Sequence, residues 1–470
     1  MVIMIQASYF LAAVLFILGL KQMSSPVTAR RGILWAGVGM VLATLVTFLD
    51  PSLHGVSNYV LMVIAIAVGG GYAWQKGKSV PMVDMPQMIA LFNGMGGGAA
   101  GAIAAVELFG AIDQTQGIPG IGVSTILSTD VAIVAIVGAF IGTLSFSGSL
   151  VAWAKLDGRF KRTSLVPQQH WVNLILLAVV VYLGVRLFDT DSTLVVLLFF
   201  ALVLVLGVFV TTPVGGADMP VAISLFNALT GLAVGLEGYV LDNAAMIIAG
   251  TVVGSAGTLL TQLMAKAMNR SVWNVLFGGF GQASAGGEAS EIEGSMKEIQ
   301  SQDASIMMAY ASQVIIVPGY GMAVAQAQHK VWELAELLEE NNVSVKFGIH
   351  PVAGRMPGHM NVLLAEAGVP YDKIFDMDEI NPDFPSATVA LVIGANDVVN
   401  PDARNDKSSP LYGMPVLDAA KAENVIVVKR GAGTGFSGVE NALFYQENTQ
   451  MLYGDGQKVV GDLIQYLKKL

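Results

Sequence analysis

Long apolar stretches dominate the first half of the chain. Nine of them approach the length of about 20 residues that an α-helix needs to cross a bilayer. They lie at residues 3–20, 32–49, 56–74, 85–106, 131–153, 171–188, 193–211, 219–240 and 244–265. The first resembles a signal peptide only superficially, because no basic segment precedes it and eight more apolar stretches follow. The pattern predicts an α-helical transmembrane bundle of nine spans over residues 1–269.

After residue 306 the pattern changes to short β-branched runs that alternate with helical segments. This alternation predicts an α/β Rossmann-like domain with a parallel sheet over residues 306–470. The predicted strands are 313–317, 343–349, 373–375, 388–393, 425–428 and 451–452, and the predicted helices are 322–341, 359–367, 418–422 and 457–469.

Residues 270–305 join the two regions. This segment opens with glycines and serines and continues as an acidic, partly helical stretch around residues 288–298. A solvated linker and a hinge that transmits domain motion to the membrane both fit this composition.

Composition and charge support the division into two regions. The chain is 54% hydrophobic and 13% charged, about half the charged share of soluble domains. Residues 1–269 contain 11 basic and 11 acidic side chains, whereas residues 270–470 contain 14 and 24, so the net charge of −10 lies in the second region. An acidic soluble domain argues against nucleic acid as a partner. The sequence has no cysteine, which excludes disulfides, thiolate catalysis and Cys-ligated metal.

Basic residues cluster on one side of the predicted spans. They follow the first, third, fifth and ninth spans and are Lys21, Arg30, Arg31, Lys76, Lys78, Lys155, Arg159, Lys161, Arg162, Lys266 and Arg270. The opposite loops contain Arg186 as their only basic residue. By the positive-inside rule, this distribution predicts an N-terminus outside the cell and a cytoplasmic C-terminal domain, as in a bacterial inner membrane.

Two spans share a local motif, which suggests an internal repeat. Asp84-Met85-Pro86 is followed by Asn93, and Asp218-Met219-Pro220 is followed by Asn227, in both cases seven residues after the proline. Three spans lie between the copies, so both enter the membrane from the same side. The asparagines either join helices by hydrogen bonds or line a water or proton path.

Other residues of the predicted spans also leave alternatives open. Glu107 and Glu237 lie near the outer ends of the two repeat spans and are either interfacial charges or the mouth of a path. Glycines recur at four-residue spacing, as in Gly250 and Gly254, which favours close helix packing.

The run 314–317 ends in Gly319-Tyr320-Gly321 and leads into a predicted helix. This order is typical of the phosphate-binding corner of a dinucleotide fold, where Gly319 permits the turn and Gly321 lets a pyrophosphate approach backbone N–H groups. Three later strand ends carry loops suited to a ligand, at 350–357, 394–397 and 429–435. Since ligands of such sheets bind beyond the carboxyl ends of the strands, we expect these loops to form one site.

The same loops favour NADP over NAD. The second strand ends in Phe347-Gly348-Ile349-His350, without the acidic residue that binds the ribose of NAD. Lys429-Arg430 instead opens the glycine-rich loop 431–435, where two cations can hold a 2′-phosphate by charge-assisted hydrogen bonds.

These motifs together resemble the beta subunit of proton-translocating NAD(P) transhydrogenase. The resemblance rests on residues 319–328, 350–361, 394–397 and 429–430, in this order, and it covers essentially the whole chain. It implies that NADP(H) binds in a reversed orientation with its 2′-phosphate at Lys429 and Arg430. It also implies that Asp397 lies near the nicotinamide and acts in coupling, not as an acid or base.

The cofactor-binding residues that the resemblance implies lie mainly on the four strand-end loops. They are Gly319, Tyr320, Gly321, Met322, Ala323, Val324, His350, Val352, Ala353, Gly354, Arg355, Met356, Pro357, Gly394, Ala395, Asn396, Asp397, Val398, Lys429, Arg430, Gly431, Ala432, Gly433, Thr434, Gly435 and Asp455.

The resemblance further implies an enzyme that is active only with one or more alpha subunits. These carry NAD(H) and further transmembrane helices, and we expect a dimer of alpha–beta units in the bilayer. Hydride transfer between NAD(H) and NADP(H) is coupled to proton movement, for which Asn93, Asn227 and Asp218 are the predicted path. Some members of the family carry a histidine at the position of Asn93. Because asparagine does not titrate, we expect the titrating group on the partner subunit.

Two rival functions come from other classes. A nucleotide-regulated channel or transporter also joins membrane helices to a Rossmann sensor domain, but the Gly-Tyr-Gly of this chain lies beyond the last span and not at the depth of a selectivity filter. A membrane NADP oxidoreductase that passes electrons to a bound redox centre needs haem or iron–sulfur ligands. The spans offer neither cysteines nor histidine pairs for them.

Overall fold

The computed structural model describes residues 2–51, 53–115, 123–161, 164–190, 192–215, 218–269, 271–272, 275, 294–409, 411–431, 433, 435 and 437–470. These residues form two compact units: the membrane unit, of Met1–Val214 and Ala222–Thr261, and the C-terminal unit, of Gly215–Val221 and Gln262–Leu470. The glycine-rich part of the predicted linker, with most of its acidic stretch, lies outside the described residues.

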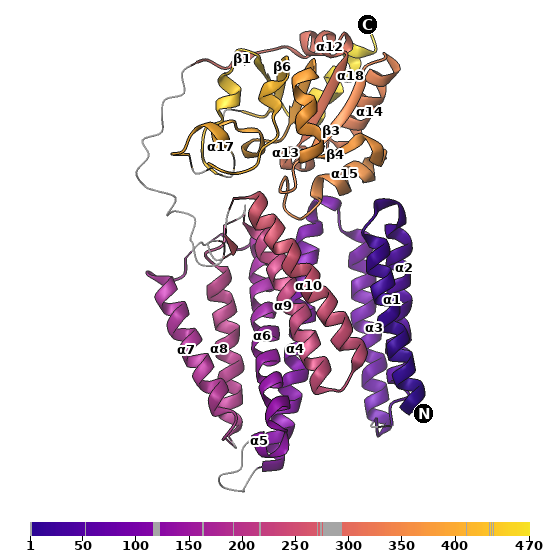
Figure 1. Ribbon diagram of the computed structural model, residues 1–470, viewed down its shortest axis with the longest axis vertical. Helices are drawn as coiled ribbons and strands as arrows, with labels where there is room; N and C mark the ends of the chain where they lie inside the picture. Colours follow the sequence, from indigo (N-terminus) through magenta and orange to yellow (C-terminus); the bar gives the residue numbers. More distant parts are fainter. Residues whose placement is uncertain are drawn as a thin grey trace. The chain divides into compact units, whose positions relative to one another are not determined.

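Within the described residues, nine helices are long and apolar enough to cross a membrane, which confirms the predicted bundle (Figure 1). They are α1 (Val2–Met23), α2 (Pro26–Thr47), α3 (Val56–Ser79), α4 (Met85–Thr115), α6 (Thr129–Leu156), α7 (Gln169–Arg186), α8 (Thr193–Thr211), α9 (Met219–Val240) and α10 (Ala244–Ala267). Two short elements accompany them, η1 (Met82–Asp84) and α5 (Val123–Ile126).

Glycines bring two pairs of these helices into backbone contact. A Cβ atom on Gly97 of α4 would lie 2.9 Å from the carbonyl oxygen of Gly142 on α6. A Cβ atom on Gly250 of α10 would lie 2.2 Å from the backbone nitrogen of Gly235 on α9. A larger residue at either crossing would force the helices apart, so the predicted packing role of the glycines is confirmed here.

The C-terminal unit contains a parallel sheet of seven strands among the described residues, in the order β1-β7-β6-β5-β2-β3-β4. The strands are β1 (Lys297–Glu298), β2 (Gln313–Pro318), β3 (Ser344–Ile349), β4 (Ile374–Asp376), β5 (Val389–Ile393), β6 (Asn424–Lys429) and β7 (Thr449–Tyr453). From β2 the chain builds outward to β4, and from β5 it builds outward in the opposite direction to β7. This doubly wound order confirms the predicted Rossmann-like domain and puts the topological switch point between β2 and β5.

Helices and 3₁₀ turns connect these strands. The helices are α12 (Ser301–Ala309), α13 (Tyr320–Val324), α14 (Gln328–Glu340), α15 (His359–Ala367), α16 (Met377–Ile380), α17 (Asp402–Asn405) and α18 (Gly456–Leu467). The 3₁₀ turns are η2 (Tyr371–Lys373), η3 (Asn381–Ser386), η4 (Asp397–Val399), η5 (Ala419–Lys421) and η6 (Ala442–Tyr445). Helix α18 packs against both α12 and α14.

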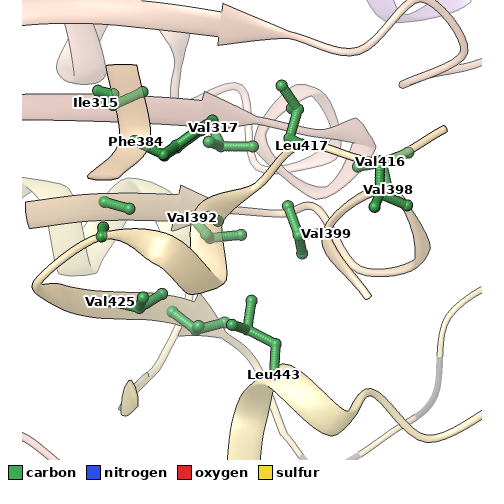
Figure 2. Packing of buried hydrophobic residues seen from close by; sticks show 14 of the residues in the cluster. Ile315, Val317, Phe384, Val392, Val398, Val399, Val416, Leu417, Val425 and Leu443 are labelled. Atoms are coloured by element: carbon green, nitrogen blue, oxygen red, sulfur yellow. The ribbon is translucent and has the colours of Figure 1, made fainter. Parts of the chain in front are cut away.

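Strand β5 is apolar throughout, and β2 and β6 are apolar except at their ends, because side chains on both faces of these central strands are buried. Alternate residues of β2, β5 and β6 share one core with side chains from the connecting segments (Figure 2). Among them, Phe384 of η3 and Leu443 of η6 are fully buried against this face of the sheet. Short connecting segments therefore cover a face that a long helix covers in many α/β domains.

All six predicted strands are present, but three other expectations need correction. The predicted helix 322–341 is wrong as a single element, because Gln326 adopts a positive φ of 51° and separates α13 from α14. The predicted helix 418–422 is only the 3₁₀ turn η5. Strand β1 and the beginning of α12 lie within the segment 270–305 that the sequence predicts as linker, so the sheet begins earlier along the chain than expected.

His350, directly after β3, is buried and joins this strand end to the core segment 411–417. Its Nδ1 accepts a hydrogen bond from the N–H of Val352 at 3.3 Å, which leaves Nε2 to donate to the carbonyl oxygen of Pro415 at 2.8 Å. Burial lowers the pKa of His350 to about 4, although the Pro415 carbonyl acts in the opposite direction. The folded domain therefore requires the neutral ring.

This requirement predicts a loss of stability in acid. Because the pKa of His350 is about 4 in the folded state and about 6.5 in the unfolded state, the unfolded state binds the proton first as the pH falls. The stabilising contribution of the neutral His350 ring is fully present above about pH 6.5 and is lost as the pH falls toward 4. The free energy of unfolding should therefore decrease by about 2 kcal/mol between pH 7 and pH 5. Hydrogen exchange of the β3 and β5 amides, corrected for intrinsic rates, measures this decrease.

The variant His350→Asn should be less stable at both pH values and should lack this part of the pH dependence. His329→Asn is the matched control, because His329 lies exposed on α14 of the same domain. An equal pH dependence in the parent and in His350→Asn would contradict the assignment of the neutral ring.

Candidate functional site

A cavity of about 890 Å³ lies at the switch point of the sheet, beyond the carboxyl ends of β2, β5 and β6. Residues from all four predicted loops line it together. The predicted residues that line it are Gly319, Tyr320, Gly321, Val352, Ala353, Gly354, Gly394, Ala395, Asn396, Asp397, Val398, Lys429, Arg430, Gly431, Gly433 and Gly435. The fold therefore brings together loops that are up to 116 residues apart in the sequence.

Backbone alone forms one wall of this cavity, where the turn after β2 meets the loop after β5. The N–H of Gly319 donates to the carbonyl oxygen of Ile393, and the N–H of Gly321 donates to that of Gly394, both at 2.9 Å. Gly394 has a φ of +70°, and a Cβ atom there would lie 2.2 Å from the backbone nitrogen of Met322. The glycines of the predicted phosphate-binding corner thus have a second role, because these two N–H groups are already bonded within the protein.

Two cations lie at the end of β6. Lys429 is half-buried, with its Nζ 4.5 Å from the ring centre of Phe444, and Arg430 is exposed. Burial lowers the pKa of Lys429, while Asp397 and Glu440 act in the opposite direction. This end of the cavity therefore offers positive charge to an anionic group.

Asp397 ties the loop after β5 to the segment that follows β6. Its Oδ2 accepts the N–H of Ser437 at 2.9 Å, and its Oδ1 accepts the Ser437 hydroxyl at 2.8 Å. Next to it, the side-chain amide of Asn441 donates to the carbonyl oxygen and to the Oδ1 of Asn396, at 2.9 and 3.0 Å. Both loops on this side of the cavity are thus held in one hydrogen-bonded arrangement.

Behind the cavity, residues 355–359 support the wall that Tyr320 and Gly354 form. The guanidinium of Arg355 lies 4.5 Å from the ring centre of Tyr320, and the backbone N–H of Arg355 donates to Nδ1 of His359 at 3.0 Å. Burial lowers the pKa of His359 to about 4, and the charge of Arg355 adds to this effect.

Several predicted cofactor-binding residues do not line the cavity. They are Met322, Ala323, Val324, His350, Arg355, Met356, Pro357 and Asp455. Of these, Asp455 is the N-cap of α18, where its carboxylate accepts the N–H groups of Gln457 and Lys458. Two further predicted residues, Ala432 and Thr434, lie outside the described residues.

Eight lining residues of the sheet domain were not predicted: Ala325, Ile393, Leu411, Met414, Val428, Ser437, Gly454 and Gly456. The Gly-Phe-Ser-Gly sequence at residues 435–438 was an available signal for Ser437, since it continues the predicted glycine-rich loop. Leu411 and Met414 carry no such signal, because they lie between the predicted elements.

Among the membrane helices, α4 and α9 both begin at the same point of the repeated motif. Helix α4 starts at Met85 and α9 starts at Met219, each directly after the motif's aspartate. The side chain of Asp84 accepts a hydrogen bond from Gln87, and Asp218 is buried. The repeat seen in the sequence is therefore also a repeat of local structure.

Polar side chains from α4, α6 and α9 meet inside the bundle. The hydroxyls of Ser145 on α6 and Thr230 on α9 lie 2.6 Å apart, and Ser145 also lies 3.0 Å from the carbonyl oxygen of Phe226. The side-chain amide of Asn93 on α4 donates to the Ser149 hydroxyl of α6 at 3.0 Å, and the backbone carbonyl oxygen of Asn93 lies 3.5 Å from the Thr230 hydroxyl. We call Asn93, Ser145, Ser149 and Thr230 the polar cluster.

Of the predicted path residues, only Asn93 belongs to the polar cluster. Asn227 is half-buried on α9, and no hydrogen bond of its side-chain amide is among those found for the described residues. The sequence analysis missed Ser145, Ser149 and Thr230, because single hydroxyls within apolar spans are common and only the helix packing aligns these three.

Similarity to known proteins extends over nearly the whole chain. The family model of the NAD(P) transhydrogenase beta subunit matches residues 5–466. Two proteins named NAD(P) transhydrogenase subunit beta, both from Rhodospirillum rubrum and one of them from a named strain, are each 45% identical to it over 464 residues, or 98% of this chain and 98% of theirs. The chain therefore belongs to the family of NAD(P) transhydrogenase beta subunits, as its motifs predict.

Proposed function

We propose that the cavity at the switch point binds NADP(H), with the adenosine 2′-phosphate at Lys429 and Arg430 and the nicotinamide toward Asp397. The observation that carries this proposal is the position of these two cations at the edge of a cavity in a transhydrogenase beta subunit. The rival channel and redox-centre functions have no comparable support.

The residues present fit a dinucleotide. Small-molecule and cofactor sites usually measure about 300–1,000 Å³, and the cavity of about 890 Å³ lies within this range. Its wall of Gly319, Gly321 and Gly394 has no side chains, so an extended ligand can lie close to the backbone. Charge-assisted hydrogen bonds from Lys429 and Arg430 suit a phosphate dianion.

The bound nucleotide supplies hydride chemistry, and the chain's own residues bind and orient it. No acid or base is needed for hydride transfer, only two rings held about 3–3.5 Å apart. We infer that Asp397 positions the loop segments beside the nicotinamide through Ser437, because its carboxylate accepts two hydrogen bonds from that residue. This role agrees with coupling and not with proton transfer to substrate.

We infer that NAD(H) binds on one or more alpha subunits, which bring further transmembrane helices and complete the enzyme. A dimer of such alpha–beta units in a lipid bilayer is the expected assembly. The loop charges support an inner-membrane location with the N-terminus outside and the sheet domain in the cytoplasm.

We propose a proton path along the membrane helices that includes Asn93, Asn227, the polar cluster and Asp218, which directly precedes α9. Hydroxyl and amide groups that meet inside an apolar bundle can order water molecules and pass protons along them. The Ser145–Thr230 distance of 2.6 Å, with Asn93 close by, supports this route.

The phosphate assignment predicts a selective loss of affinity. Arg430→Ala should weaken NADP(H) binding by about 1–3 kcal/mol, the range for hydrogen bonds to charged groups, and should leave NAD binding unchanged. Calorimetry on the purified full-length chain measures both affinities. Lys421→Ala is the matched control, because it removes one exposed cation that pairs with Asp418 and does not line the cavity. Equal losses for NADP and NAD would contradict the assignment.

The path predicts a loss of proton pumping on removal of one hydroxyl. Thr230→Val keeps the shape of the side chain but removes its contact with Ser145, which should slow proton-coupled turnover about three- to tenfold. Pumping by vesicles that contain both subunits measures it. Thr251→Val is the matched control on the next helix, because the Thr251 hydroxyl is exposed and bonds only within α10. If both variants pump like the parent, the cluster serves packing alone.

A further inference from the structure

Glu237 on α9 is a fully buried carboxyl group inside the membrane unit. Its exposed fraction is 0%, and neither carboxylate oxygen has a hydrogen-bond partner among the described residues. None of the ion pairs found for these residues includes it. Ionisable side chains at such positions are costly to keep in a membrane bundle, so a carboxyl group there requires a functional explanation.

Helix α6 leaves space for this carboxyl group at Gly138. A Cβ atom on Gly138 would lie 2.1 Å from Oε1 and 3.1 Å from Cδ of Glu237. No other residue type fits this position of α6 while the carboxyl stays where it is. The glycine and the glutamate are therefore a matched pair across the α6–α9 contact.

The matched pair lies on the same helix faces as the polar cluster. Glu237 follows Thr230 by seven residues on α9, and Gly138 precedes Ser145 by seven residues on α6. Seven residues are about two helical turns, or about 10 Å along the axis, and they return to the same face. The α6–α9 contact thus carries hydroxyls at one level and a carboxyl group two turns nearer the C-terminal end of α9.

In the part of the chain that the structure describes, the charged group found to interact electrostatically with Glu237 is the acidic Glu107 on α4. Nearer the helix end, the exposed Asp130 of α6 accepts a hydrogen bond from Tyr239 of α9 at 2.8 Å. Lys155, the basic side chain of α6, lies at the opposite end of that helix and donates to the carbonyl oxygen of Val214.

We propose that Glu237 is a proton-binding group of the membrane path and that a glycine at position 138 is sterically required to leave room for its carboxyl group. The step is the gain of one proton by a carboxylate oxygen from water on the outer side, followed by its release to water on the side of Thr230. This inference rests on the proposed proton path and names a titrating group within this chain, where the sequence alone pointed to the partner subunit.

The test uses the alpha–beta complex reconstituted in vesicles and the variants Glu237→Gln and Glu237→Asp. Glutamine keeps the shape of the side chain and aspartate keeps the acid. If Glu237 binds the proton, Glu237→Gln should pump at least about tenfold more slowly while Glu237→Asp retains more activity than Glu237→Gln. A purely structural role predicts that Glu237→Gln pumps faster than Glu237→Asp, since glutamine fills the space of glutamate better than the shorter aspartate does. NADP(H) affinity should stay unchanged in both variants.

Infrared difference spectroscopy gives a second readout. The parent should show a carboxyl C=O band that responds to pH or to turnover, and Glu237→Gln should lack it. Asp113→Asn is the matched control, because Asp113 is an exposed carboxyl group near the end of α4, and this variant should retain both the band and the pumping. Pumping and bands in Glu237→Gln equal to those of the parent would overturn the inference.

Gly138→Ala covers the case in which a change of Glu237 prevents assembly with the alpha subunit. The Cβ atom of the new alanine would collide with the carboxyl group of Glu237 but would leave that group in place. Proton pumping should therefore slow, and the pH profile of pumping should shift. A pH profile equal to that of the parent would overturn the inference. If the parental complex itself moves no protons, the proposed function fails instead, and the two failures are thereby distinguished.

Discussion

The backbone contact between the turn after β2 and the loop after β5 is the constraint on which the C-terminal domain depends. Gly319 and Gly321 donate hydrogen bonds to the β5 end, and Gly394 approaches Met322 so closely that no side chain can be accommodated. These strands are the two from which the sheet grows in opposite directions. Because neither loop can move without breaking this contact, the cavity at their carboxyl ends has one rigid wall made of backbone.

The other side of the cavity is held by side chains instead. Asp397 and Asn396 reach the segment after β6 through Ser437 and Asn441, in hydrogen bonds that span 40 and 45 residues of sequence. The same segment begins with Lys429 and Arg430, so the loop that carries the positive charge is also the loop that the carboxylate positions. The proposed binding of a phosphate at these cations would therefore be physically connected to the arrangement of the loop near Asp397.

The membrane unit reaches close approach by a similar use of small residues. Helix α6 contacts α4 through Gly97 and Gly142, and it contacts α9 at Gly138 and Ser145. Where two glycines meet, the helices pack backbone against backbone. Where a glycine or serine of α6 faces a longer polar side chain, the small residue leaves room for a carboxyl or hydroxyl group inside the apolar bundle. One helix thus provides both the packing and the polar positions, which explains why α6 is among the most buried of the spans.

Features that depend on neighbouring residues could be predicted from the sequence alone. Apolar length predicted the spans, β-branched runs predicted six strands, and the loops that follow them identified most of the cavity lining, including Lys429 and Arg430. Strand β1 could not be predicted from the sequence, because its two exposed residues show no hydrophobic pattern and form a strand only by pairing with β7. The break at Gln326, the burial of His350 against Pro415, the Asp397–Ser437 bonds and the polar cluster were likewise decided by tertiary structure. Each depends on groups brought together by packing from distant parts of the chain, and local propensity contains no information about such distances.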